Sequence, residues 1–138
     1  MRRLAKKEKL DQRIAVVEET ADNIYSVKFI LQSLGYSVGS FSFKAPRLSL
    51  LLEFEPQLVI VDMMIPERGA YDAIRRIRRS RIGQVPILAI TAEAMEGNDE
   101  EVFEAGGQDV LAKPYSIGDL QKKLDKWLCP ATGLAKDI

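Results

Sequence analysis

Four short apolar runs of this sequence each end in polar side chains that could take part in chemistry. The polar residues are Glu18 and Glu19 after residues 14–17, Asp62 after 58–61, Thr91 after 87–90, and Lys113 after 110–112. Such runs are typical of parallel strands covered on both faces, and open α/β sheets bind ligands at the carboxyl ends of their strands. The sequence therefore predicts that carboxylates, a hydroxyl and an amine converge on one edge of a sheet.

The composition limits the chemistry of such an edge. The chain has 138 residues, no histidine, and 20 basic against 20 acidic side chains, so its formal net charge is zero. Without histidine there is no imidazole base, no Ser-His-Asp triad and no zinc site built on imidazole. The chemistry must use carboxylates, hydroxyls, lysine or a hard metal ion. The charge balance gives no overall attraction to nucleic acid or to a membrane surface.

The length fits a single domain with its own core. The only cysteine, Cys129, cannot form an intrachain disulfide, and every apolar run is too short to cross a bilayer. We therefore expect a reducing, cytoplasmic setting. Residues 1–11 are expected to form a basic tail, residues 12–128 the domain, and residues 129–138 an unstructured end.

Strands and helices are predicted to alternate along the chain. Strands are expected at residues 14–17, 36–38, 58–61, 86–90 and 110–112, with helices at about 20–34, 46–55, 71–81, 96–105 and 116–128. Gly35 would end the first helix, and the pair Ser116 and Asp119 resembles a capping box that would open the last one. This alternation requires a doubly wound parallel sheet with right-handed crossovers and helices on both faces.

The order of these motifs resembles the receiver domain of two-component response regulators, over about residues 12–128. The resemblance rests on Glu18-Glu19, Asp62 with Pro66, Thr91-Ala92 and Lys113-Pro114, each near an expected strand end. Residues 91–99 (TAEAMEGND) are also similar to the Thr-Ala-x-Ala-Met-x-Gly-Asp stretch common in receivers. The resemblance implies a flavodoxin-like fold, with five parallel strands in the order 2-1-3-4-5 and five helices.

The resemblance also implies a phosphoprotein of phosphorelay signal transduction. Asp62 would accept a phosphoryl group from a sensor histidine kinase or a histidine phosphotransfer protein, giving an aspartyl phosphate. Mg²⁺ would be held by Glu19 directly, by Glu18 through water, by Asp62, and by the backbone carbonyl of Met64.

Other residues would bind the phosphoryl group and transmit the signal, again by resemblance. Thr91, Ala92 and Lys113 would bind its oxygens, and Pro66 and Pro114 would shape the neighbouring loops. A changed surface on the fourth helix, fifth strand and fifth helix would then contact a downstream protein. The implied function is a stand-alone receiver, a monomer or weak homodimer without direct nucleic-acid or membrane contact. It would not be an enzyme beyond self-phosphorylation and slow autodephosphorylation.

Three positions depart from the usual receiver pattern. The acidic pair holds two glutamates, where most receivers have at least one aspartate, and the extra methylene moves the carboxylate oxygens. Val110 stands three residues before Lys113, where receivers usually have the tyrosine or phenylalanine of the switch. The loop over residues 67–70 reads Glu-Arg-Gly-Ala, in place of the usual Asp-Gly at its last two positions.

These departures leave other interpretations open. The first is a pseudo-receiver, an interaction module of the same fold that works without phosphorylation. The second is a small phosphatase or nucleotide-binding α/β protein using Asp62 and Mg²⁺. It is disfavoured because no second aspartate lies two residues later and no glycine-rich phosphate loop follows the first strand. Asp62 could also cap a turn, and the glutamate pair could simply open a helix.

Overall fold

The core of the protein is a parallel sheet with helices packed on both faces. The computed structural model describes residues 12–18, 27–42, 45–63, 69–92 and 98–128. The strands are β1 (Arg13–Val17), β2 (Ser37–Phe41), β3 (Leu58–Asp62), β4 (Ile87–Thr91) and β5 (Asp109–Ala112). All neighbouring strands are parallel, in the order β2-β1-β3-β4-β5. The predicted doubly wound, flavodoxin-like topology is therefore confirmed.

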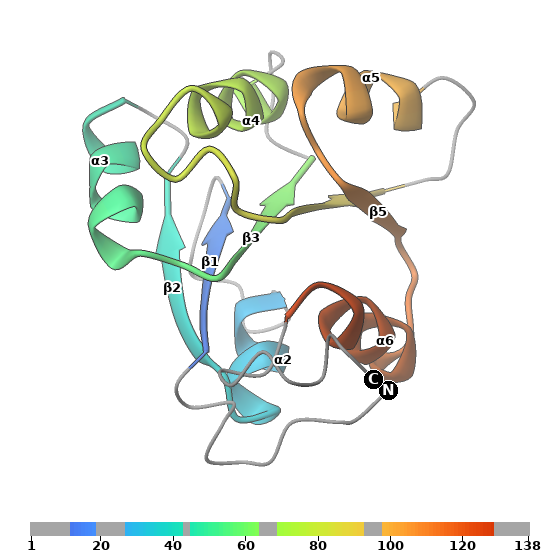
Figure 1. The fold of residues 1–138 in the computed structure, drawn as a ribbon. Helices are drawn as coiled ribbons and strands as arrows, with labels where there is room; N and C mark the ends of the chain where they lie inside the picture. Colours follow the sequence, from blue (N-terminus) through green and yellow to red (C-terminus); the bar gives the residue numbers. More distant parts are fainter. Residues whose placement is uncertain (1–11, 19–26, 43–44, 64–68, 93–97, 129–138) are drawn as a thin grey trace, which may run out of the picture.

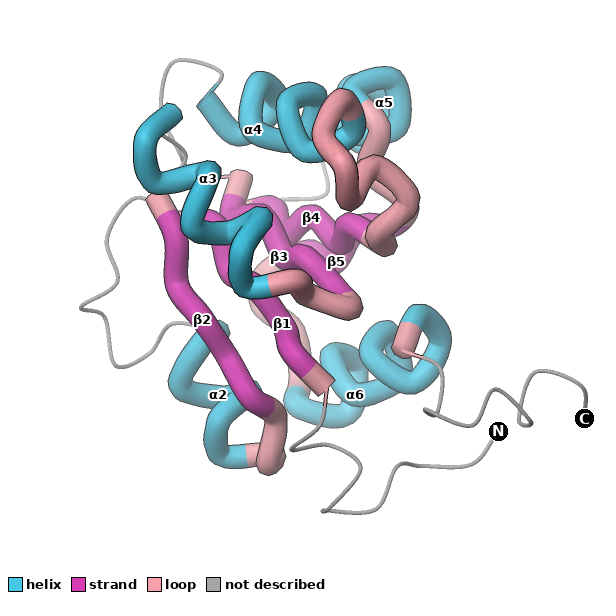
Figure 2. Tube along the Cα trace, turned by 60° about the vertical axis from the view of Figure 1, so that its left-hand side comes forward, coloured by secondary structure: helices cyan, strands magenta, loops and turns pink. Residues whose placement is uncertain are grey.

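The described helices divide into two layers. They are α2 (Val27–Ser33), α3 (Ala45–Phe54), α4 (Gly69–Arg78), α5 (Asn98–Ala105) and α6 (Ile117–Trp127). Figure 1 shows α2 and α6 on one face of the sheet and α3, α4 and α5 on the other, and Figure 2 shows the strands between these layers. No helix among the described residues is both long and apolar enough to cross a membrane.

Alternate residues of each central strand enter two separate cores. In β1, Ile14 and Val16 pack in the cluster that includes residues of α2 and α6, while Ala15 packs in the cluster under α3 and α4. Ile60 and Val61 of β3 divide in the same way, because successive side chains of a strand point to opposite faces. Burial on both faces explains the continuous apolar runs in the sequence.

The second strand differs from its predicted bounds of 36–38. It runs from Ser37 to Phe41 because it pairs with β1 along that whole length. Tyr36 precedes the strand and is buried, and its hydroxyl accepts a hydrogen bond of 3.0 Å from Gln121 Nε2. The second half of the strand was not predicted from the sequence because it begins with Gly39, and glycine is depleted in strands. Gly35 ends α2 with φ of 99°, as predicted.

The last helix is capped as expected and is anchored to β5. Ser116 and Asp119 form a complete capping box. The Asp109 carboxylate, at the start of β5, accepts hydrogen bonds of 2.8 Å from Lys123 Nζ and from Trp127 Nε1. Burial alone would raise the pKa of Asp109, but the hydrogen bonds from Lys123, Trp127 and the Val110 N–H together lower it below its ordinary value.

Arg78, at the end of α4, joins three segments on the other face. Its Nε donates to the carbonyl of Gly106 at 2.7 Å, and its Nη1 donates to the carbonyls of Gly83 and Val85 at 2.9 and 2.6 Å. Its Nη2 donates to Gln108 Oε1 at 2.5 Å. Partial burial lowers its pKa. This guanidinium therefore ties the turn before β5 to α4 and to the segment before β4.

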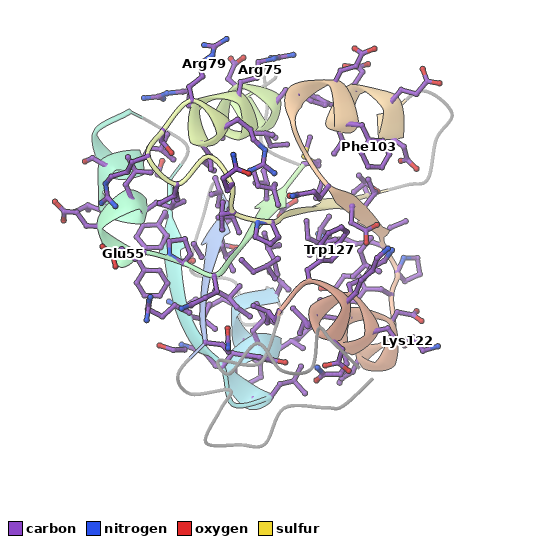
Figure 3. The ribbon with its side chains drawn as sticks, in the orientation of Figure 1. Glu55, Arg75, Arg79, Phe103, Lys122 and Trp127 are labelled. Atoms are coloured by element: carbon purple, nitrogen blue, oxygen red, sulfur yellow. The ribbon has the colours of Figure 1, made fainter. Side chains whose placement is uncertain are left out.

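We expect Arg78→Lys to lower the free energy of unfolding by about 2–4 kcal/mol, because one ammonium cannot reach all of these acceptors and buried carbonyls lose their donor. Urea unfolding followed by circular dichroism measures the change. Arg79, the residue directly after α4, points away from the protein (Figure 3) and provides the matched control. Arg79→Lys should change the same free energy by less than about 0.5 kcal/mol. Equal effects of the two substitutions would contradict the role of Arg78 in joining these segments.

Because the pKa of Asp109 is lower in the folded state, its charge stabilises the fold above the ordinary carboxyl pKa. That contribution is lost as the pH falls through the lowered value. Asp109→Asn keeps the size and one acceptor but removes the charge, so it should destabilise the protein most at neutral pH. Unfolding free energies compared from about pH 6 to about pH 3 should show the difference between wild type and variant shrinking. A constant difference would exclude this linkage.

Candidate functional site

Two of the predicted acids meet at the carboxyl ends of β1 and β3. These strands are in register up to Val17 and Val61, so Glu18 follows β1 at the level of Asp62, the last residue of β3. The charge of Asp62 contributes to raising the pKa of Glu18, as is expected for two carboxyl groups at one sheet edge. The parallel sheet thus brings together residues that are far apart in the sequence.

The next two strands add a hydroxyl and an amine to this edge. Thr91 pairs with Ala112 in register, and its carbonyl accepts a hydrogen bond of 2.8 Å from the N–H of Lys113. Lys113 Nζ lies 4.0 Å from Asp62 Oδ2. The structure therefore places the Lys113 ammonium near Asp62 and places Thr91 at the end of the neighbouring strand.

The exposure of these side chains differs. The side chain of Asp62 is 26% exposed and that of Lys113 is 44% exposed, so a group arriving from solvent can reach both. Thr91 is only 4% exposed, and its Oγ1 has no hydrogen-bond partner among the described residues. A buried hydroxyl without a partner costs stability, and an oxygen of an incoming group could accept its hydrogen bond.

Glu18 is a buried carboxyl group at a site with a second acid. It is 6% exposed, and Ser40 Oγ donates a hydrogen bond of 2.6 Å to its Oε1. Burial is the main reason that the pKa of Glu18 is raised, and the charge of Asp62 raises it further. The hydrogen bond from Ser40 and the charges of Lys28 and Lys113 act in the opposite direction.

This donor set suits a hard divalent cation. Glu18 and Asp62 offer carboxylate oxygens, and their mutual repulsion would be relieved by a positive ion between them. Among the described residues no group of three potential side-chain ligands is present. Glu19 and Met64, the other predicted ligands, lie outside the described residues, as does Pro66.

The remaining predicted positions lie close by. Ala92 is exposed directly after β4, and Pro114 is exposed and follows a cis peptide bond with Lys113. Val110 lies within β5, half-buried and paired with Ala89, so an aliphatic side chain occupies this position.

Sequence reasoning missed two residues near the site. Ser40 lies beyond the predicted end of the second strand, and only the pairing of β2 with β1 brings it to Glu18. Tyr115 is half-buried and packs against the core that includes α2 and α6. Burial raises its pKa, and so does the charge of Asp62. Ser40 belongs to no short motif, so no local signal marked it. Tyr115 directly follows Lys113-Pro114, and this closeness to the motif kept it out of the predicted switch position.

Comparison with known proteins identifies relatives along most of the chain. The family model of the response regulator receiver domain matches residues 14–125. The transcriptional regulatory protein PhoP of Escherichia coli is 29% identical over 126 residues, covering 91% of this chain and 56% of PhoP. The chain therefore spans about half the length of the curated relatives it matches.

Solved structures show the same fold. The chemotaxis protein CheY4 of Vibrio cholerae has a TM-score of 0.73 at 22% identity, covering 85% of this chain and 98% of that one. The receiver domain of a sensor histidine kinase from Pseudomonas aeruginosa is described with a magnesium ion coordinated in its active site cleft. It has a TM-score of 0.68 at 33% identity, covering 84% of this chain and 96% of that one. The topology, the strand-end residues and the matching family model together show that this chain belongs to the response regulator receiver domain family.

Proposed function

We propose that this chain accepts a phosphoryl group on Asp62 and passes the resulting signal to another protein by contact. The observation that carries the proposal is the placement of Lys113 Nζ 4.0 Å from Asp62 Oδ2. Thr91, at the end of the strand next to β3, adds a hydroxyl that has no partner among the described residues. The donor would be a phosphohistidine on a sensor histidine kinase or on a histidine phosphotransfer protein. Membership of the receiver family supports this class of donor.

The transfer requires little covalent chemistry from the protein. A carboxylate oxygen of Asp62 forms a bond to phosphorus while the bond between phosphorus and the donor imidazole nitrogen breaks. Phosphoryl transfer is catalysed mainly by positioning and by positive charge on the transferring oxygens. The Lys113 ammonium offers such charge, and its exposure lets it move toward the incoming group. Thr91 offers a hydroxyl donor that has no competing partner among the described residues.

A bound Mg²⁺ ion would supply further charge neutralisation on the transferring oxygens. Glu18 and Asp62 would provide carboxylate oxygens for it, and Glu19 and the Met64 carbonyl are the other proposed ligands. A magnesium ion described in the active site cleft of the Pseudomonas aeruginosa relative supports this choice of metal.

The signal would leave the site through β5 and its neighbouring helices. A phosphoryl group would give the Thr91 hydroxyl a partner, and the Thr91 carbonyl is already bonded to the Lys113 N–H that follows β5. Phe103 of α5 and Ile117 of α6 are 50% and 58% exposed, so this side of the protein offers apolar contacts to a partner. We propose no turnover beyond self-phosphorylation and slow loss of the phosphoryl group.

Addition of acetyl phosphate or beryllofluoride with Mg²⁺ should shift the two-dimensional NMR amide signals around Asp62 and Thr91. Asp62→Asn should abolish these shifts, since it removes the nucleophilic carboxylate while keeping the size of the side chain. Asp72→Asn, at an acid of α4 whose side chain is 65% exposed, is the matched control and should respond like the wild type. A folded wild-type protein with no response would favour the pseudo-receiver instead.

Thr91→Val should separate stability from signalling. The change removes a buried hydroxyl that has no partner among the described residues, so the free energy of unfolding should stay the same or rise by about 1 kcal/mol. The same variant should show much smaller beryllofluoride-induced NMR shifts in β5 and α6. Beryllofluoride stands in for the phosphoryl group, and in this variant it has no hydroxyl of β4 to bind. Urea unfolding and NMR measure the two quantities. Destabilisation by more than about 1 kcal/mol would argue that the hydroxyl has a structural partner.

A further inference from the structure

The hydrogen bond between Ser40 and Glu18 connects the edge strand β2 to the site. Ser40 Oγ lies 2.6 Å from Glu18 Oε1. The two backbones are held in place as well: Ser40 pairs with Val16 in register, and the N–H of Glu18 donates to the Phe41 carbonyl at 3.1 Å. The serine hydroxyl therefore approaches the carboxylate from a fixed position.

We propose that Ser40 is a positioning residue for the cation that the proposed function requires. Its hydrogen bond occupies one oxygen of Glu18 and fixes the orientation of the carboxylate, so that the second oxygen is presented to the cation or to a water bound to it. This inference rests on the proposed function, since it concerns the same cation site.

The need for such a residue follows from the use of glutamate. A glutamate side chain has one more rotatable bond than aspartate, so holding its carboxylate in one orientation costs more conformational entropy. A hydrogen bond from a short side chain on a paired strand reduces that cost before the cation arrives. Glu18 is 6% exposed, so solvent contributes little to its orientation. The serine thus compensates for the extra methylene at position 18.

The charge of the site makes the same hydrogen bond useful for a second reason. Glu18 follows β1 at the level of Asp62, so two acidic side chains lie at the same edge of the sheet. A neutral hydroxyl can donate to the carboxylate without competing with the cation as a positive charge would. Lysine or arginine in its place would itself neutralise the acids and displace the metal.

Mg²⁺ titration of the full chain by isothermal calorimetry at constant neutral pH tests the proposal. Ser40→Ala should weaken Mg²⁺ binding by about tenfold or more, as loss of a hydrogen bond to a metal ligand commonly does. Ser40→Thr keeps the hydroxyl and should restore most of the affinity. Ser37→Ala, the same change at the other end of β2, is the matched control and should bind as the wild type does.

Two further measurements separate the possible outcomes. Urea unfolding without metal reports whether Ser40→Ala destabilises the fold. If the variant is as stable as the wild type, its weaker Mg²⁺ binding cannot be explained by unfolding. Phosphorylation by acetyl phosphate at saturating Mg²⁺ should still occur in Ser40→Ala. If this variant binds Mg²⁺ as tightly as wild type while both are phosphorylated, the role of Ser40 is overturned and the proposed function stands. If the wild type neither binds Mg²⁺ nor becomes phosphorylated, both fail.

Discussion

Parallel pairing of the strands is the constraint on which the site depends. Because the strands run in one direction, all their carboxyl ends meet at the same edge, and the register then places Glu18 beside Asp62. Thr91 and Lys113 reach this edge from β4 and from the segment after β5. The apolar runs that end in these residues are buried on both faces, so the backbone beneath the site has little freedom to move.

The site itself holds groups that are costly in isolation. Two carboxyl groups repel each other in a partly buried place, and the hydroxyl of Thr91 lacks a partner among the described residues. Ser40 and Lys113 offset part of the repulsion. Functional sites commonly retain such local costs because the packing elsewhere compensates for them. Here the compensation comes from two apolar cores, one on each face of the sheet.

The segment that would carry the signal is bonded to neighbouring elements at both ends. Arg78 binds the carbonyl of Gly106 in the turn before β5, and Asp109 at the start of the strand is bonded to α6. The other end of β5 leads to Lys113, whose side chain is exposed.

The sequence alone determined the fold class and the positions of Asp62, Thr91 and Lys113 at strand ends. The apolar runs specify buried parallel strands, and the polar residues that end them specify Asp62 and its neighbours, because both signals are local. Only the tertiary structure identified Ser40 and Arg78, since their partners lie 22 and 28 residues away and depend on strand register and helix packing. It also extended β2 through Gly39, because pairing with β1 outweighs the weak strand preference of that residue.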